Sequence, residues 1–265
     1  MQTFTIGGTI AASDDELIIA SAAGTVTAYA APPAVTFSPA GGTFAQPVDV
    51  AVSAADPSAT IRYTVDGSAP ALTSPIVVSG QTVRMAASGK LRTILIKGSA
   101  ISRIYQATFT VNTPVQNWRQ TYFGSMANAG TAADTFDFDG DGIINLLEFA
   151  FGTDPTVRGT GPLLYSGTFA SGGTVTAKGQ PITRMESAGN GIDFRAILVR
   201  RKDYAAAGLT YTPQFSGDLL TWLPSATPPT VLADDGTHQI VSIPYPPFVG
   251  GKKARFFKIS VTIAP

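Results

Sequence analysis

Cysteine is absent from the 265 residues of this sequence. The chain therefore has no disulfide framework, no thiolate metal site and no cysteine nucleophile. Charged residues are also sparse, at 14%, whereas glycine and proline number 27 and 19. This composition favours short strands and many turns over long helices. A hydrophobic content of 44% excludes a wholly disordered chain.

Groups that usually carry catalysis are equally scarce. The single histidine, His238, precedes an expected strand in the run GTHQI, and we expect it to be exposed there. The chain has no Gly-x-Ser-x-Gly motif for a nucleophilic serine. A glycosidase needs two carboxylates in a cleft, but the acids here fall in turns or in one acidic segment. We therefore expect the chain not to be an enzyme.

The net charge is zero, but its distribution along the chain is uneven. Residues 1–113 carry six basic and six acidic groups, residues 114–159 carry two and six, and residues 160–265 carry ten and six. The basic excess of the last segment is scattered over expected strands, which indicates solvated surface and no nucleic-acid partner. The acidic excess is concentrated in the middle segment.

The beginning of the chain lacks the features of a leader or a membrane span. No basic residue precedes Arg62, so the charged region of a signal peptide is missing. The longest early apolar run, from Leu17 to Ala23, is interrupted by Ser21 and is too short to span a bilayer. We expect no membrane span in this chain, and an export signal outside it if it is part of a longer secreted protein.

The acidic middle segment, DFDGDGIINLLE at residues 137–148, matches the twelve-residue calcium loop of an EF-hand. Carboxylates stand at loop positions 1, 3, 5 and 12, with a glycine at position 6 for the sharp turn. Four carboxylates this close would repel one another without a cation. The sequence predicts a Ca²⁺ site with these ligands: Asp137, Asp139, Asp141, the backbone carbonyl of Ile143, Asn145 directly or through a water, and Glu148.

Helices are expected on both sides of this loop. Thr113-Pro114 is typical of a helix start, and an apolar face follows at Val115, Trp118, Tyr122 and Met126. A second helix is expected from about Asn145 to Phe151, ended by Gly152 and Pro155. We expect Trp118 to anchor the core of this helix pair. Asp154 either supplies a further oxygen to the ion or simply forms the turn after the helix.

The rest of the sequence indicates strands. Short apolar or alternating runs over residues 34–111 are separated by turn residues, a spacing typical of an immunoglobulin-like β-sandwich. They lie at 35–37, 48–52, 60–65, 82–86, 91–96 and 105–111. A second β domain follows, with expected strands at 163–165, 174–177, 192–199, 210–215, 230–232, 239–243 and 256–263. Residues 1–31 hold three further short strands, at 3–6, 16–20 and 25–29, with Pro32-Pro33 as a boundary.

Three runs carry a family resemblance: FSPAGGTF at 37–44, TIRYTVDGSAP at 60–70, and Ser74-Pro75. They are similar to the chitobiase/β-hexosaminidase C-terminal domain family, over residues 34–111. The resemblance implies a small immunoglobulin-like module appended to secreted bacterial enzymes and surface proteins. It implies no catalytic site.

Two weaker resemblances cover the remainder of the chain. The segment from Trp118 to Pro155 resembles dockerin-like and thrombospondin-type-3-like calcium segments of secreted bacterial proteins, which often carry paired loops where this chain has one. Residues 190–265 resemble a C-terminal β-sandwich that follows such segments. In this domain Trp222, with Tyr204, Tyr211 or Tyr245 near it, is a candidate for stacking on a sugar ring, and burial against a strand is the alternative. Tyr211 is the tyrosine we select as its partner.

Together these patterns predict a mainly β fold: two antiparallel β-sandwich modules joined by a helix-loop-helix EF-hand-like calcium unit. The expected segments are a partial β segment (1–33), an immunoglobulin-like chitobiase C-terminal-type domain (34–112), a calcium-binding linker (113–158) and a C-terminal β-sandwich (159–265). The function predicted is a non-catalytic, extracellular spacer or interaction tail of a larger bacterial protein. Two alternatives stay open: a carbohydrate-binding accessory region of a polysaccharide-degrading enzyme, and a stalk that adheres to or anchors at a cell surface.

Overall fold

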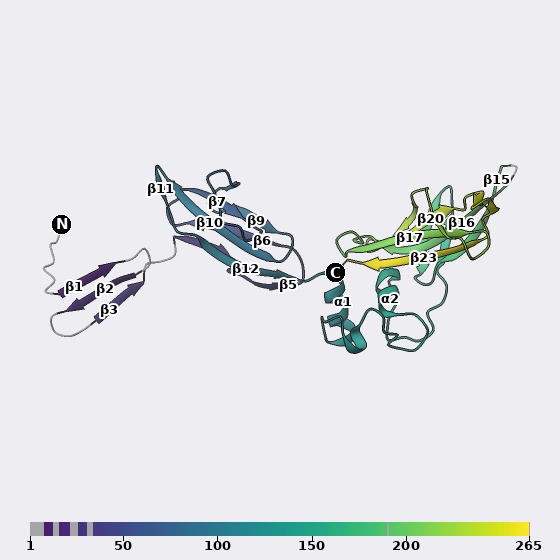
Figure 1. Ribbon diagram of the computed structural model, residues 1–265, viewed down its shortest axis with the longest axis horizontal. Helices are drawn as coiled ribbons and strands as arrows, with labels where there is room; N and C mark the ends of the chain where they lie inside the picture. Colours follow the sequence, from purple (N-terminus) through teal and green to yellow (C-terminus); the bar gives the residue numbers. More distant parts are fainter. Residues whose placement is uncertain (1–7, 13–15, 22–25, 31–33, 190, 265) are drawn as a thin grey trace. The chain divides into compact units, whose positions relative to one another are not determined.

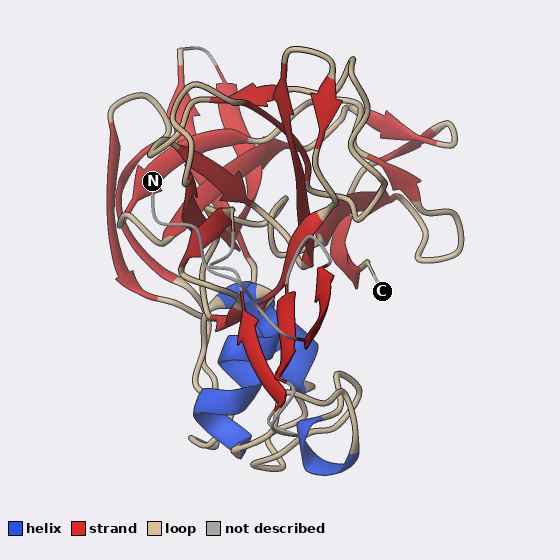
Figure 2. Ribbon diagram, turned by 90° about the vertical axis from the view of Figure 1, so that its left-hand side faces the viewer, coloured by secondary structure: helices blue, strands red, loops and turns tan. Residues whose placement is uncertain are grey.

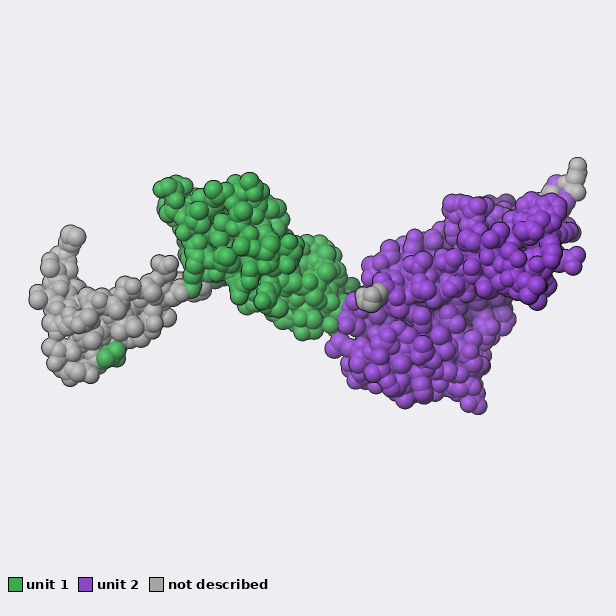
Figure 3. Space-filling model, viewed as in Figure 1, with its two compact units in different colours: residues 1–112 green, residues 113–265 purple. Residues whose placement is uncertain are grey.

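The computed structural model describes residues 8–12, 16–21, 26–30, 34–189 and 191–264. The chain forms two compact units, residues 1–112 and 113–265 (Figure 3). Strands dominate the described residues, and the two α-helices found in them both belong to the second unit (Figure 1). The mainly β fold expected from the sequence is confirmed. None of these helices combines the length and the apolar character needed to cross a bilayer.

The first unit begins with a three-stranded antiparallel sheet in the order β1-β2-β3. Its strands are β1 (Gly8–Ala12), β2 (Glu16–Ser21) and β3 (Val26–Ala30). The sequence predicted β2 and β3 but not β1. The strand expected at 3–6 and the Pro32-Pro33 boundary lie outside the described residues.

A β-sandwich of two sheets follows in the same unit. One sheet has the order β4-β6-β9 and the other β5-β12-β10-β7-β8, with β11 paired to β10. The strands of the first sheet are β4 (Val35–Ser38), β6 (Val48–Ala54) and β9 (Thr82–Met85). Those of the second are β5 (Gly42–Phe44), β7 (Thr60–Thr64), β8 (Ile76–Val77), β10 (Gly89–Lys97), β11 (Ala100–Ile101) and β12 (Tyr105–Val111).

The core of this sandwich follows from alternation along its strands. In β12 every second residue from Ala107 to Val111 is buried, because successive side chains of a strand point to opposite faces. Phe109 from this strand packs with Leu91 of β10 and with Val50 of the facing sheet. The inner faces of the two sheets therefore form one continuous apolar core.

The second unit also contains two facing sheets. The first has the order β15-β16-β20-β19 and the second β18-β17-β23. Their strands are β15 (Ile182–Ala188), β16 (Gly191–Arg201), β17 (Leu209–Ser216), β18 (Leu223–Pro224), β19 (Thr230–Asp234), β20 (His238–Pro244) and β23 (Phe256–Ile263). Two short antiparallel pairs accompany them: β13 (Leu164–Thr168) with β14 (Gly172–Ala177), and β21 (Phe248–Val249) with β22 (Lys252–Lys253).

Strand β16 is buried on both faces, which explains its unbroken apolar run. Ala196 and Leu198 pack with Phe215 of β17 in one cluster. Ile197 and Val199 belong to a second cluster, which includes residues of the β13–β14 pair. The sequence did not predict β15, because its apolar residues do not follow the alternation of the strand: the half-buried positions include Arg184 and Glu186, whereas Met185 is exposed.

The helices pack on the sheets of the second unit. They are α1 (Pro114–Phe123), the short 3-10 helix η1 (Gly130–Ala132) and α2 (Asn145–Phe151). Val115 and Phe149 share an apolar cluster with Leu209 of β17 and Val261 of β23, and Figure 1 shows α1 and α2 beside β23. Figure 2 draws the helices in blue and the strands in red. The sequence suggested a separate joint over residues 113–158, whereas the structure groups this segment with the C-terminal strands.

Candidate metal centre

Helix α1 begins with a reciprocal cap. The Gln116 amide N–H donates to Thr113 Oγ1 (3.3 Å), and the Thr113 N–H donates to Gln116 Oε1 (2.8 Å). This satisfies two of the amides that an α-helix leaves unpaired at its start. The helix places Trp118 against Phe149 of α2, with ring centroids 5.4 Å apart. The anchoring role expected for Trp118 agrees with this contact.

A polar network holds the segment between α1 and the acidic loop. The guanidinium of Arg119 is almost fully buried and donates to the carboxylate of Asp134. Asn128 makes two hydrogen bonds with the same residue. Its Nδ2 donates to Asp134 Oδ2 (2.8 Å), and its Oδ1 accepts from the Asp134 N–H (2.7 Å). A buried ion pair of this kind is costly to break by removing one partner. It fixes the entry into the loop.

Asn145 ties the start of α2 to the preceding segment. Helix α2 has Ile144 at its cap position, which offers no side-chain acceptor. The Asn145 N–H instead donates to Phe136 O (2.8 Å), and its Nδ2 donates to Thr131 O (2.9 Å) and Ala133 O (2.8 Å). The side chain is fully buried and its Oδ1 has no hydrogen-bond partner. That oxygen is the group Asn145 has left for an ion or an ion-bound water.

The acidic loop draws its three aspartates together. Asp137 Oδ1 accepts from the Gly140 N–H (2.8 Å) and Asp137 Oδ2 from the Gly142 N–H (2.9 Å). Asp139 and Asp141 each accept from the amide two residues further on (3.0 and 2.8 Å). The half-buried carboxylates of the three aspartates offer oxygens that all lie within 4.8 Å of one another. Gly142 has φ 93°, a conformation that a side chain disfavours.

Glu148, in the first turn of α2, is not part of this group of mutually close oxygens, but the charges of the three aspartates act on it. Its side chain is fully buried, and neither carboxylate oxygen has a hydrogen-bond partner. Burial, followed by the charges of Asp139, Asp141 and Asp137, raises the pKa of Glu148 to about 8. One oxygen of Asp139 is likewise buried without a partner. A buried carboxylate without a partner is strongly disfavoured, and these oxygens together have the chemistry of a hard-cation site.

The segment after α2 folds back over the loop. Arg158 Nε donates to the Asp139 carbonyl (2.9 Å). The N–H groups of Gly159 and Thr160 donate to Asp141 Oδ2 (3.2 and 2.8 Å). One oxygen of Asp141 is therefore occupied by backbone amides, and the other also accepts from Ile143. Hydrogen bonds from the protein itself therefore hold both the segment that enters the loop and the segment that follows α2.

Asp154 has a local role. Its Oδ1 accepts from the N–H and the hydroxyl of Thr156 (2.9 and 2.7 Å). Asp66 makes the same turn with Ser68 in the first unit (2.9 and 2.6 Å). Turn formation thus accounts for Asp154, although its charge also contributes to the raised pKa of Glu148.

Two residues of the sheets fix the position of α2. The Tyr211 hydroxyl donates to Ala150 O (2.6 Å) and accepts from the Arg201 N–H (3.2 Å), and burial raises the pKa of Tyr211 to about 12. His238, expected to be exposed, is 7% exposed and packs against Gly152 at the end of α2. The expectation failed because the covering helix is distant in sequence. No local pattern at His238 signals this contact.

Trp222 is half-buried at the other candidate stacking position. Its Nε1 donates to Leu219 O (3.1 Å), and the Lys258 ammonium lies 4.4 Å from its ring centroid. The ring therefore already has a cation above it and a bonded N–H. Tyr211 is engaged with α2. Stacking on a sugar by either residue remains a prediction from the sequence.

Comparison with known proteins concerns the first unit. Residues 39–110 match the family model of the chitobiase/beta-hexosaminidase C-terminal domain. The match begins directly after β4, covers the sandwich from β5 to β12 and confirms the resemblance seen in that module. No curated protein matches the chain.

Proposed function

We propose that this chain is a non-catalytic accessory region of a larger secreted protein, and that its second unit binds one Ca²⁺ in the loop at residues 137–148. The observation that carries the proposal is the carboxylate of Glu148. It is fully buried, has no hydrogen-bond partner, and experiences the charges of three aspartates. A divalent cation is the partner that relieves all of these costs together.

The donor set favours calcium over other metals. The proposed ligands are all oxygens: the side chains of Asp137, Asp139, Asp141 and Glu148, the carbonyl of Ile143, and Asn145 Oδ1 directly or through a water. A site without imidazole or thiolate ligands suits a hard cation. Ca²⁺ accepts six to eight oxygens in flexible geometry, whereas Mg²⁺ demands near-octahedral coordination and keeps its waters.

The ion's role in this proposal is structural. Glu148 and Asn145 lie on α2, whose other face packs on the C-terminal sheets, so an ion bound by both loop and helix would stiffen the whole attachment. Extracellular calcium sites commonly bind with dissociation constants of about 10⁻⁴–10⁻³ M. At millimolar calcium, a tenfold excess over that constant stabilises the folded unit by about 1.4 kcal/mol.

The accessory role rests on the first unit. The family matched there is a domain found at the C-terminal side of chitobiase and β-hexosaminidase, as its description says, and the match supports an extracellular accessory module. A spacer is the first candidate. Carbohydrate binding is the second, and the observation that favours it is the pocket described in the next subsection.

Isothermal titration of the full chain with CaCl₂ tests the ion site. We expect one site with a dissociation constant of about 10⁻⁴–10⁻³ M. Glu148→Gln keeps the shape of the side chain and removes its charge, and should weaken binding at least tenfold. Asp66→Asn is the matched control, because it removes one carboxylate from a turn in the other unit.

The proposal fails if the folded wild-type protein gives no binding heat at 5 mM CaCl₂ (a concentration about five times the weakest constant expected). It fails equally if Glu148→Gln binds as tightly as the wild type. Circular dichroism of each variant establishes that it is folded. Titration with MgCl₂ ranks the two ions, and a tighter Mg²⁺ site would contradict the choice of calcium.

A further inference from the structure

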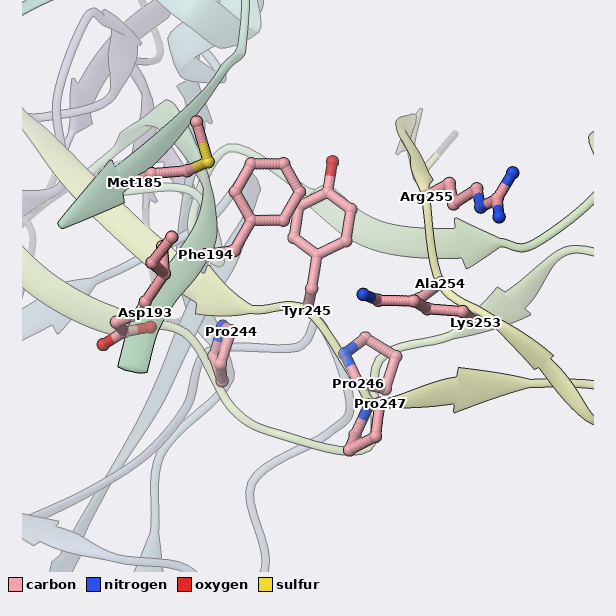
Figure 4. Close-up of a pocket in the computed structure, with 11 residues that line it drawn as sticks. Met185, Asp193, Phe194, Pro244, Tyr245, Pro246, Pro247, Lys253, Ala254 and Arg255 are labelled. Carbon is pink, nitrogen blue, oxygen red and sulfur yellow. The ribbon is translucent and has the colours of Figure 1, made fainter. Parts of the chain in front are cut away.

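A cavity of about 630 Å³ lies in the second unit, where β15 and β16 approach the segments around residues 244–247 and 253–255 (Figure 4). None of its lining residues belongs to the acidic loop, and none is a residue that the sequence singled out for calcium. It brings together an aromatic wall, two prolines in succession and several charged side chains. Two of the lining residues, Tyr245 and Ala254, also belong to the apolar cluster around Phe215, so the cavity borders the core of the unit.

The aromatic wall consists of Phe194 and Tyr245. Their ring centroids are 4.3 Å apart with an interplanar angle of 34°, so the two rings are stacked with an offset and partly overlap, as Figure 4 shows. Phe215 of the core supports Tyr245 from another side, at 4.6 Å and nearly edge-on. Both rings are half-buried, so the wall is preorganised and still accessible. Pro246 and Pro247 continue it with little conformational freedom.

The hydroxyl of Tyr245 is available for a hydrogen bond to a ligand at this wall. The Tyr245 hydroxyl has no hydrogen-bond partner among the described residues, and burial raises the pKa of Tyr245 to about 12. The group is therefore a neutral donor and acceptor at neutral pH. A ligand that packs on the ring can use it.

The charged groups of the cavity leave a positive excess. Asp193 is neutralised by Arg195, whose Nε and Nη2 both donate to its Oδ2 (2.9 and 2.7 Å). Lys253 and Arg255 are exposed and have no ion pair with any described residue. In Figure 4 the ammonium of Lys253 is directed toward Tyr245. The neighbouring Lys252, by contrast, is paired with Asp218 (2.8 Å).

We propose that this cavity binds an anionic saccharide, a sugar ring bearing a carboxylate or sulfate group, as part of a longer polysaccharide. The apolar C–H face of the ring packs on the accessible part of the stacked Phe194–Tyr245 pair, and its hydroxyls reach the Tyr245 hydroxyl. The anionic substituent pairs with Lys253, since cationic side chains bind such oxyanions through charge-assisted hydrogen bonds. Arg255, whose guanidinium points away from the two rings in Figure 4, adds positive charge at the edge of the cavity. A few polar groups around an apolar wall are typical of small-ligand pockets.

This inference is independent of the calcium proposal. It commits to the chemistry of an anionic sugar because the positive excess has no use in binding a neutral one. An aromatic wall alone would serve any apolar ring. The combination of wall, free hydroxyl and unpaired cations fits a ligand with an apolar face and a charged edge.

Calorimetric titration of the full chain with three sugars tests the inference. The probes are oligogalacturonate, which carries carboxylates, a heparin-derived sulfated disaccharide, and a neutral chitin-derived oligosaccharide. We expect at least one anionic sugar to bind about tenfold more tightly than the neutral one. The better of the two anionic probes identifies the substituent.

Two charge-reversed proteins locate the site. Lys253→Glu with Arg255→Glu should weaken binding of the anionic sugar at least tenfold. Lys90→Glu with Lys258→Glu changes the net charge equally at exposed positions and should bind within about twofold of the wild type. The second pair also removes the cation above Trp222, so it reports on that residue as an alternative site.

Several results would overturn the inference. They are the absence of binding by either anionic sugar, equal loss of binding in the two double variants, and equal affinity for the neutral and the anionic sugars. Binding should persist in calcium-free buffer and in Glu148→Gln. Loss of sugar binding in both of those conditions would place the sugar at the acidic loop instead.

Discussion

The sandwich at residues 34–112 and the helix-loop-helix at residues 113–160 differ in how they satisfy their buried groups. In the sandwich, the buried side-chain atoms without a hydrogen-bond partner are Arg62 Nε and Thr93 Oγ1. In the helix-loop-helix they include both carboxylate oxygens of Glu148 and one of Asp139. Apolar packing alone accounts for the sandwich. The other region contains buried acidic oxygens for which the protein supplies no partner.

Their apolar cores differ in the same sense. The sandwich core is built from the module's own strands, from β4 to β12. The helix pair contributes Val115, Phe149 and Ala150, and its cluster is completed by Ala207 and Leu209 from the C-terminal part. A helix of seven residues such as α2 is marginal by itself. The helix-loop-helix thus depends on its neighbours, and by our proposal on an ion, where the sandwich depends on neither.

The largest expected effect concerns the sandwich. Phe109→Ala empties the centre of its core and should lower the free energy of unfolding of the first unit by about 3–5 kcal/mol. Calorimetry should show two unfolding transitions, the first from the first unit and the second from the second unit. Phe109→Ala should lower the midpoint of the first and leave the second unchanged, with and without calcium. Movement of both transitions, or rescue by calcium, would mean that the two units are not independent.

Acid should remove a stabilising contribution of His238 from the second unit, whereas protonation of Glu148, whose pKa is raised to about 8, acts in the opposite direction. Burial, and then the charges of Lys178 and Arg201, lower the pKa of His238 from 6.5 to about 4, against the opposing effect of Asp235 and Asp203. Folding thus favours the neutral ring, so this contribution is complete above pH 6.5 and is lost as the pH falls through 4. It amounts to about 3 kcal/mol at most.

The measurement is thermal unfolding in metal-free buffer at pH 7.5 and pH 4. Glu148 contributes equally in both proteins, so the difference between them reports on His238. On going from pH 7.5 to pH 4, the unfolding temperature of the second unit should fall less, or rise more, in His238→Gln than in the wild type. The first transition provides an internal reference, because His238 lies in the other unit. An equal change in unfolding temperature in wild type and variant would show that His238 does not contribute to the pH dependence of stability.

Substitution of Gly152 tests how tightly α2 is held on the sheets. Gly152 has φ 71° at the end of the helix, and a Cβ there would collide with the His238 ring. Gly152→Ala should lower the free energy of unfolding of the second unit by about 1–3 kcal/mol. Gly98→Ala is a matched control with φ 60° and open space around it. Equal losses of unfolding free energy in the two variants would show that backbone strain, and not the collision with His238, causes the effect.

Calcium should stabilise only one of the two regions. At a tenfold excess over the dissociation constant, the second transition should gain about 1.4 kcal/mol, which corresponds to about 3–6 °C for a unit of this size. The first transition should not move. In Glu148→Gln the gain should disappear, and the metal-free variant should be at least as stable as the metal-free wild type because its buried charge is gone. A calcium-induced shift of the first transition would contradict the comparison.

The smallest effect is expected at Asp154. Asp154→Asn retains an acceptor for Thr156 and should change the free energy of unfolding by less than about 0.5 kcal/mol. It should change calcium affinity by about threefold or less. Asp139→Asn, at a proposed ligand, should weaken calcium tenfold or more in the same titration. Equal weakening in both variants would make Asp154 a ligand.

Local signals were enough to predict much of the fold. The bounds of α2 and β12 agree with the sequence-based expectation, because a glycine ends the one and strict alternation defines the other. The start of α1 follows from Thr113-Pro114. Strand β15 was missed, since an edge strand with little burial leaves only a weak pattern.

For the candidate site, the ligand types and their spacing were predictable from residues 137–148 alone. The groups that hold the site were not. Arg119 pairs with Asp134, fifteen residues away, and Tyr211 reaches Ala150 across 61 residues. Neither partner is marked by anything close to it in the sequence.

By itself the sequence determined a mainly β chain with an acidic loop spaced for a cation, because strand alternation, helix caps and loop spacing are properties of neighbouring residues. Only the tertiary structure decided that the helix pair packs on the C-terminal sheets, that Glu148 is buried without a partner and that Lys253 stands beside an aromatic wall. Burial and charge pairing depend on residues brought together from distant parts of the chain, so no short stretch of sequence contains them.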